Sequence, residues 1–270
     1  MMRDLLRFPL GPSPAERAAG KVWLVGAGPG DLELLTLKAV RVLGEAEVVL
    51  VDDLVNPEIL SHCAQARTVW VGKRGGCRST SQAFIQRLMW RLARQGKCVV
   101  RLKGGDPGVF GRAGEEALWL HARGVPCEVV NGVTAGAAAA TACGFPLTMR
   151  GMTMGVTLVT GHTEHGDTPN WPALAHSGTT LVIYMGVSTM AQTQDSLLRA
   201  GMEPSTPVAM VENASLAQQR HRLSTLAHML ADARDFGLRS PAILVVGQVV
   251  GMAEALVPLA GASKRTGTLG

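Results

Sequence analysis

The stretch VVRLKGGDPGVFGRAGEE, residues 99–116, reads as one strand, one irregular loop and the beginning of one helix. Gly104 and Gly105 allow a ligand to approach the backbone closely. Asp106 can accept hydrogen bonds from an amine or a hydroxyl. Ligands of open α/β sheets bind at the carboxyl ends of the strands, so this loop is predicted to form part of a ligand site.

Strands and helices alternate on both sides of this stretch. Apolar runs predict strands at residues 22–26, 47–51, 67–71, 99–102 and 127–130, and helical spacing predicts helices at 32–43, 81–95 and 112–122. Such alternation is typical of a mostly parallel sheet that is covered on both faces. The fold class is therefore α/β.

A second alternating set follows residues 150–155, which break the pattern and are predicted to be an interdomain hinge. Its strands are expected at 157–160, 180–185, 207–211 and 242–246, and its helices at 189–200 and 223–232. The expected organisation is a flexible N-terminal arm (1–20), an N-terminal α/β domain (21–150), a C-terminal α/β domain (151–260) and a flexible tail (261–270). A cleft between two such domains is a common ligand site.

Composition narrows the function classes. The 26 Lys and Arg exceed the 21 Asp and Glu by five, which suits an acidic ligand, but no basic run indicates nucleic acid. The five cysteines include no C-x-x-C pair, which indicates reduced thiols in a cytoplasmic protein, and no metal site is expected. No apolar run is long enough to span a membrane.

Two further glycine-containing loops each join a strand to a helix. In GAGPGD (26–31), Asp31 replaces the third glycine of a dinucleotide-binding turn and Pro29 lacks an amide donor. A nicotinamide site and a tight turn with an Asp N-cap both remain open readings of this loop. NGVTAG (131–136) could accept a flat ring, or could simply begin a Thr-capped, Ala-rich packing helix.

Together these segments closely resemble the tetrapyrrole methylase family. The resemblance extends from about Val22 to Val250, and its most specific block is RLKGGDPGVFGRAGEE (101–116). The other matching segments, in family order, are VGAGPGDLELLTLKA (25–39), VVLVDDLV (48–55), VGKRGG (71–76), VVNGVTAG (129–136), FPLTMR (145–150), VTGH (159–162), YMG (184–186), PVAMVENAS (207–215) and PAILVVGQVV (241–250).

The resemblance implies a two-domain α/β fold, with each sheet flanked by helices, a homodimer, and S-adenosylmethionine held between the domains as the methyl donor. The positions that match cofactor contacts of the family are Pro29, Gly104, Gly105, Asp106, Val109, Thr134, Ala135, Met185 and Ala214. Asp52 and Lys73 match a proton acceptor and a proton donor. Arg112 is expected to act catalytically as an electrostatic stabiliser, and Lys103, Glu115 and Arg150 to bind substrate.

The activity that the resemblance implies is methylation of uroporphyrinogen III at two ring carbons, C2 and C7, which gives precorrin-2 by way of precorrin-1 and leaves S-adenosylhomocysteine. The product would serve sirohaem, cobalamin or haem d1 synthesis. A later precorrin methylation, an NAD-linked oxidoreductase and a non-catalytic tetrapyrrole-binding protein are the alternatives. The chain departs from the family pattern at Val51, Asp53, Gly108, Asn131 and Met149, which bears on substrate choice.

Overall fold

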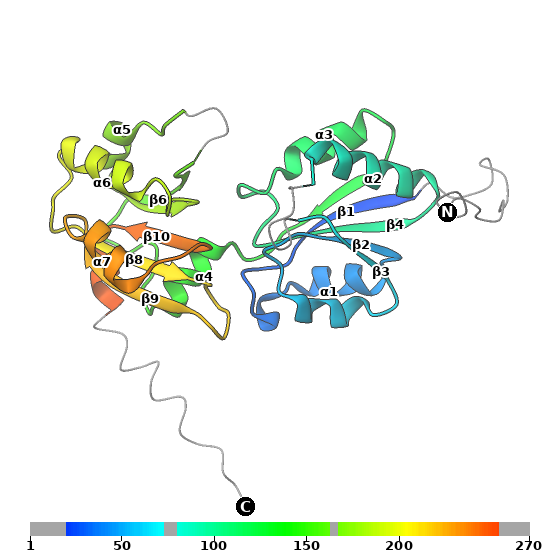
Figure 1. Ribbon diagram of the computed structural model, residues 1–270, viewed down its shortest axis with the longest axis horizontal. Coiled ribbons are helices and arrows are strands. Elements are labelled where there is room, and N and C mark those ends of the chain that lie inside the picture. The colour runs from blue at the N-terminus through cyan, green and yellow to red at the C-terminus, as the bar shows by residue number, and fades with distance from the viewer. Residues whose placement is uncertain (1–19, 73–79, 163–166, 254–270) are drawn as a thin grey trace, which may run out of the picture.

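The computed structural model describes residues 20–72, 80–162 and 167–253, and within them it contains two five-stranded sheets (Figure 1). The first sheet has the order β3-β2-β4-β1-β5 and is parallel throughout, as predicted. Its strands are β1 (Lys21–Gly26), β2 (Val48–Val51), β3 (Arg67–Trp70), β4 (Cys98–Lys103) and β5 (Cys127–Val130).

Helices cover both faces of this first sheet. The short helix η1 (Leu32–Leu34) and helix α1 (Leu37–Gly44) follow β1, and α1 packs on one face together with η2 (Pro57–Cys63). Helices α2 (Gln82–Arg94) and α3 (Ala113–His121) pack on the other face. The chain therefore leaves the neighbouring strands β1 and β4 toward opposite faces, and such a divergence opens a crevice at the carboxyl ends of the strands.

The second sheet has the order β6-β7-β10-β8-β9 and is mixed. Its strands are β6 (Gly155–Thr160), β7 (Thr179–Tyr184), β8 (Pro207–Glu212), β9 (Arg220–Thr225) and β10 (Ala242–Val246). Among these, β6 and β7 pair in parallel, and the other pairs are antiparallel. The expectation of a mostly parallel sheet is therefore wrong for this half.

The helix expected at residues 223–232 is also only partly correct. Residues 223–225 belong to β9, and α7 spans Met229–Phe236. Strand β9 lies at the edge of the sheet and its first three residues are exposed, so it lacks the apolar run that marks a strand in the sequence. Helices α5 (Trp171–Ala175), α6 (Met190–Arg199) and α7 cover one face of the second sheet.

Helix α4 (Ala135–Ala142) covers the other face of the second sheet (Figure 1), and η3 (Gln248–Met252) packs into the same core cluster. Residues 150–155 therefore do not join the two halves, because they connect α4 to β6 within the second half. We propose that the domain boundary falls before Ala135 rather than at residue 150. Among the described residues, no helix has the length and apolar character needed to cross a membrane.

Candidate active site

A pocket of about 520 Å³ lies at the carboxyl ends of β1 and β4 and is closed by segments of the second half. The loops after β1, β2 and β4 and the first turn of α4 supply one side. The ends of β7 and β8 and the residues just before β10 supply the other. The nine predicted cofactor-binding residues all line this pocket: Pro29, Gly104, Gly105, Asp106, Val109, Thr134, Ala135, Met185 and Ala214.

The glycine-rich loops brace one another through their backbones. Gly28 and Gly105 form an isolated antiparallel bridge, in which each amide donates to the other residue's carbonyl at 3.2 and 2.7 Å. A Cβ on Gly26 would lie only 2.6 Å from the Gly132 nitrogen and 2.7 Å from the Gly105 oxygen. Glycine is therefore required at Gly26 by close packing of backbone on backbone.

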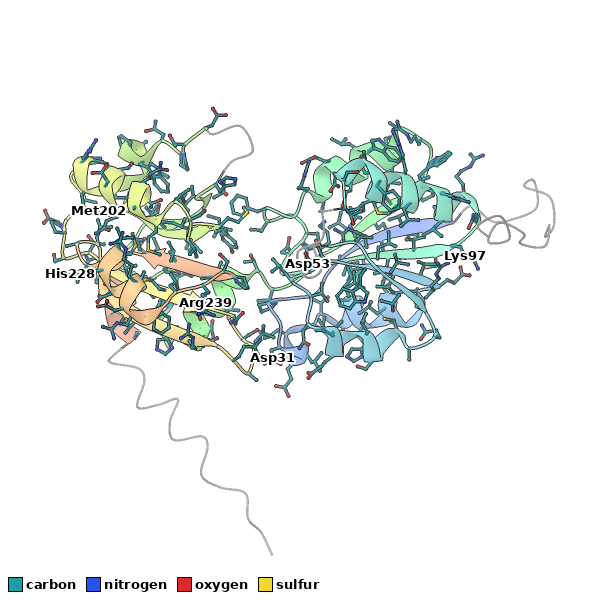
Figure 2. The ribbon with its side chains drawn as sticks, in the orientation of Figure 1. Asp31, Asp53, Lys97, Met202, His228 and Arg239 are labelled. Atoms are coloured by element: carbon teal, nitrogen blue, oxygen red, sulfur yellow. The ribbon has the colours of Figure 1, made fainter. Side chains whose placement is uncertain are left out.

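Three amides of the first loop, those of Ala27, Gly28 and Asp31, are already engaged. Ala27 N donates to the Lys103 carbonyl at 2.8 Å, and Asp31 N donates to the Ser215 hydroxyl at 3.1 Å. The Asp31 carboxylate caps η1 by accepting from Glu33 N. A dinucleotide-binding turn presents free amides to a pyrophosphate, so this geometry disfavours the nicotinamide reading and favours a braced turn. Asp31 lies where the two halves face each other, as does Asp53 (Figure 2).

Asp106 ties the central loop to the loop after β5. One carboxylate oxygen accepts from Gly108 N at 2.7 Å, and the other accepts from Gly132 N at 3.0 Å and from the Asn131 amide at 3.2 Å. Carboxylates that accept several hydrogen bonds inside a protein are held firmly in one orientation. Asp106 therefore shapes the pocket as well as lining it. Asn131, where the family pattern has proline, adds one of these three bonds.

Tyr184, at the end of β7, joins the two halves. Its hydroxyl lies 2.7 Å from the Thr134 hydroxyl and accepts from Gly136 N at 3.0 Å. Thr134 therefore does not cap α4 with its side chain, contrary to the packing-helix interpretation. The ring of Phe110 packs against Tyr184 with centroids 5.0 Å apart. The sequence around Tyr184 does not indicate this contact, because it depends on how the two halves meet.

Residues with strained backbone angles cluster at the same pocket. Three of its lining residues have left-handed backbone angles although they are not glycine: Phe110 (φ 53°), Met185 (φ 54°) and Asn213 (φ 48°). Arg112 and Ser215, which share this conformation, are each close in sequence to a lining residue. Such conformations persist only where surrounding structure enforces them, and they concentrate at functional sites.

The model of one protein family, described as Tetrapyrrole (Corrin/Porphyrin) Methylases, matches residues 21–230 of this chain. The chain belongs to the tetrapyrrole methylase family. The match covers the whole first sheet and strands β6 to β9 of the second, and it ends before β10. The resemblance noted in the sequence is therefore confirmed at the level of the family.

Three named relatives of this tetrapyrrole methylase are described by the same activity. A Pseudomonas aeruginosa protein named uroporphyrinogen-III C-methyltransferase is 66% identical over 231 residues, which is 86% of this chain and 94% of the relative. A Methanosarcina barkeri protein named S-adenosyl-L-methionine-dependent uroporphyrinogen III methyltransferase is 45% identical over 88% of this chain and 94% of the relative. One solved structure is that of the Thermus thermophilus uroporphyrin-III C-methyltransferase with S-adenosylhomocysteine. It superposes with a TM-score of 0.76 at 45% identity, over 86% of this chain and 100% of the T. thermophilus chain.

The predicted catalytic and substrate-binding residues of this methylase are divided between the pocket lining and the exposed surface. Asp52 and Lys103 line the pocket. Lys103 is buried, and its amine lies 3.3 Å from Glu116, so it is not a freely presented cation. Burial, helped by the nearby Arg101 guanidinium, lowers the pKa of the Lys103 amine, while the Glu116 and Asp52 carboxylates offset part of that effect.

Three other predicted residues lie outside the pocket lining. Arg112 and Glu115 are exposed and form a two-pronged ion pair, with 3.0 and 2.8 Å separations, at the start of α3. Arg150 is exposed in the turn after α4. Lys73 lies outside the described residues. The Asp53 carboxylate lies against Gly72, where it occupies the space that a Cβ on this glycine would fill.

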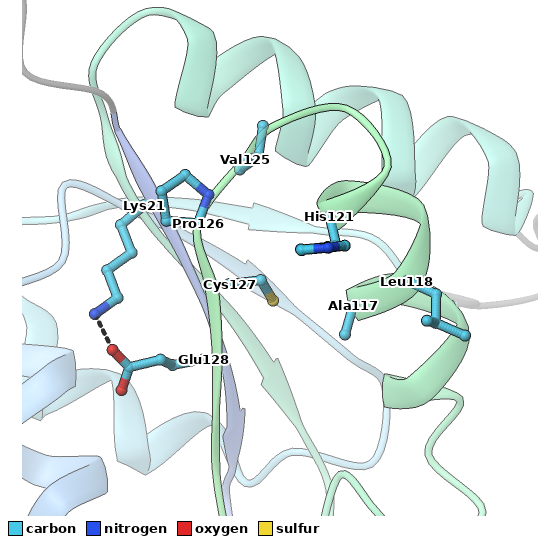
Figure 3. Close-up of a pocket in the computed structure, with 8 residues that line it drawn as sticks. All are labelled: Lys21, Ala117, Leu118, His121, Val125, Pro126, Cys127 and Glu128. Carbon is cyan, nitrogen blue, oxygen red and sulfur yellow. Dashed lines mark hydrogen bonds and ion pairs between the residues drawn. The ribbon is translucent and has the colours of Figure 1, made fainter.

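A second pocket, of about 570 Å³, lies between α3 and β5 and is bordered by Lys21, His121 and Glu128 (Figure 3). Lys21 begins β1, so this pocket is at the amino end of the strands, opposite the glycine-rich loops. Its Lys21 and Glu128 side chains neutralise each other in an ion pair. None of the predicted catalytic, cofactor-binding or substrate-binding residues that the structure describes lines it, and the site at the carboxyl ends of the strands remains the candidate.

Proposed function

We propose that the protein transfers methyl groups from S-adenosylmethionine to uroporphyrinogen III at two ring carbons, C2 and C7. The observation that carries the proposal is one pocket lined by all nine residues that match the family's cofactor contacts. The names of the P. aeruginosa and M. barkeri relatives, and the T. thermophilus complex with S-adenosylhomocysteine, support the same donor and substrate.

The pocket suits the donor in size and lining. Its volume of about 520 Å³ falls in the range of small-molecule sites. Most of its exposed surface is apolar, and glycine backbone at Gly28, Gly104 and Gly105 lets a ligand approach closely. When bound, the sulfonium donor supplies an electrophilic methyl group, so the protein's task is to align it with the acceptor carbon and to exclude water.

The substrate carries eight carboxylates, and cationic side chains near the pocket would bind them. We propose Arg112 and Arg150 for this role, with Lys73 from the segment outside the described residues. Glu115 holds the Arg112 guanidinium in one orientation through their paired hydrogen bonds. Lys103, which is buried beside Glu116, would contribute positive potential to the pocket rather than direct contact with a solvated carboxylate.

The reaction releases a proton. As the bond between sulfur and the methyl carbon breaks, a bond from the ring carbon to that methyl forms, and the macrocycle then loses one proton. We propose Asp52 as the acceptor, because its carboxylate lines the pocket and is about one third exposed. Arg112 would act electrostatically, by pairing with substrate carboxylates so that the ring carbon lies in line with the methyl group.

The same family membership supports a homodimer that works in the cytoplasm. The homodimer is tested by light scattering of the purified protein, in which a monomer at micromolar concentration would count against it.

The test of the function is a methylation assay. The purified protein is incubated with S-adenosylmethionine and enzymatically made uroporphyrinogen III, and the products are analysed by mass spectrometry. A product that carries two added methyl groups is expected. No added methyl group would refute the proposal. Methylation of precorrin-2, supplied in a parallel assay, without methylation of uroporphyrinogen III would favour the sibling specificity.

A further inference from the structure

Strand β4 places two cations on one face of the first sheet. Val99, Arg101 and Lys103 alternate toward α2 and α3, while Val100 and Leu102 point to the opposite face. Val99 packs in the apolar core beneath these helices. Arg101 and Lys103 are only 2% and 4% exposed. Burying two cations is costly unless anions accompany them.

The anion between them is Glu116 of α3, which is completely buried. Its carboxylate lies 3.5 Å from the Arg101 Nε and 3.3 Å from the Lys103 amine, and it accepts from the Gln82 amide at 2.9 Å. Three donors from β4 and α2 therefore fix this carboxylate in position. Glu116 in turn fixes one side of the Arg101 guanidinium.

The other side of Arg101 reaches the pocket through Asp52. The Arg101 Nη2 lies 3.0 Å from one oxygen of the Asp52 carboxylate, and the second oxygen accepts from Asp53 N at 3.1 Å. The Nη1 group points toward the carbonyls of Leu50 and Leu102, at 3.5 and 3.4 Å. Arg101 itself does not line the pocket, whereas Asp52 does.

We propose that Arg101, oriented by Glu116, is a positioning residue that fixes the Asp52 carboxylate at the methyl-transfer site. This inference rests on the proposed function. Buried ion pairs are often no more stabilising than apolar residues of similar volume, so stability alone does not explain the arrangement. Asp52 is the one partly exposed side chain of these ion pairs, and its carboxylate lines the pocket. When a catalytic base is displaced by about 1 Å from its productive position, the rate of the reaction can fall by a large factor.

The test is a double-mutant cycle in the methylation assay. Arg101→Met is expected to lower kcat about tenfold or more, with KM for uroporphyrinogen III and calorimetric affinity for S-adenosylhomocysteine changed less than about twofold. Arg101→Lys should restore part of kcat. In an Asp52→Asn background, the same Arg101 substitutions should cause less than about a twofold further loss, because the residue acts through Asp52.

Arg41→Met is the matched control, because it removes an arginine that pairs with Glu45 on the exposed face of α1; its kcat should equal that of the wild type. Glu116→Gln should also lower kcat, and its effect should likewise vanish in the Asp52→Asn background. If Arg101→Met does not fold, the double-mutant cycle with Asp52→Asn is measured with Arg101→Lys instead.

Unchanged kcat in the Arg101 variants, or losses that multiply with that of Asp52→Asn, would overturn the positioning role while wild-type activity upheld the proposed function. Absence of methyl transfer by the wild-type protein would overturn the proposed function, and this role with it.

Discussion

Single residues set the shape of the pocket through contacts that only particular residue types allow. The glycines and Asp106 could be predicted as site residues from the sequence, because loops with these residues after strands are unusual and the family motif contains them. Arg101, Glu116 and Tyr184 were not predicted. A charged residue in a strand or helix gives no sign in the sequence that it is buried, and the Tyr184 contact depends on how the two halves meet.

Gly26→Ala is expected to reduce the free energy of unfolding by about 2 kcal/mol, because the new methyl group would press on the backbones of Gly105 and Gly132. Gly114→Ala is the control. Gly114 lies in α3 with no atom within 4 Å of its added Cβ, so this variant should be neutral or more stable by up to about 1 kcal/mol. Urea unfolding measures both, and equal effects would contradict the backbone contact.

Asp106→Asn is expected to weaken calorimetric binding of S-adenosylhomocysteine about tenfold or more. The new NH2 group would face either the Gly108 N donor or the Asn131 amide and Gly132 N donors, so at least one of the three hydrogen bonds that shape the loop would be lost. Asp195→Asn, on the exposed face of α6, should bind like the wild type. Wild-type affinity in Asp106→Asn would show that the loop does not need this carboxylate.

Strands that contain apolar residues were predicted well from the sequence. Elements whose position depends on their packing partners were predicted poorly. Strands β1, β2 and β4 have buried apolar runs and were placed within one residue. Strands β3 and β5 are only partly buried, but each ends in apolar residues and was also placed within one residue. Strand β9 was missed because an exposed edge strand lacks such a run. Helix α4 consists of small residues with no clear apolar face, so the sequence could not indicate which sheet it covers.

Ala139→Leu tests the packing of α4 on the second sheet. Ala139 is completely buried in the core with Val182 and Val245, so the larger side chain should lower the free energy of unfolding by about 1–3 kcal/mol. Ala142→Leu makes the same change at an exposed position of the helix and should have little effect. Chemical denaturation compares the two variants, and similar stabilities would place α4 elsewhere.

At the scale of the whole molecule, the pocket depends on both halves. Residues that line it come from the first half, such as Pro29 and Gly105, and from the second, such as Met185 and Ala214. The Asp31 amide and the Ser215 hydroxyl form a hydrogen bond between the halves at its edge. The sequence predicted a site between two domains, but not which segments of the second domain would close it.

Hydrogen exchange measured with and without S-adenosylhomocysteine tests this shared pocket. Because a ligand stabilises the segments that it contacts, exchange should slow in residues 26–31 and 104–111 and also in 213–216. Peptides that cover the second pocket, near Val125 and Glu128, serve as the internal control and should exchange at unchanged rates. Protection confined to one half would contradict a site built from both.

The stoichiometry of the reaction tests the central claim most directly. The amount of S-adenosylhomocysteine released is measured against the uroporphyrinogen III consumed when the purified wild-type protein is supplied with excess donor. The account predicts two molecules of S-adenosylhomocysteine for each molecule of uroporphyrinogen III, since two ring carbons are methylated in turn. Consumption of neither compound, under conditions in which the protein is folded, would contradict it.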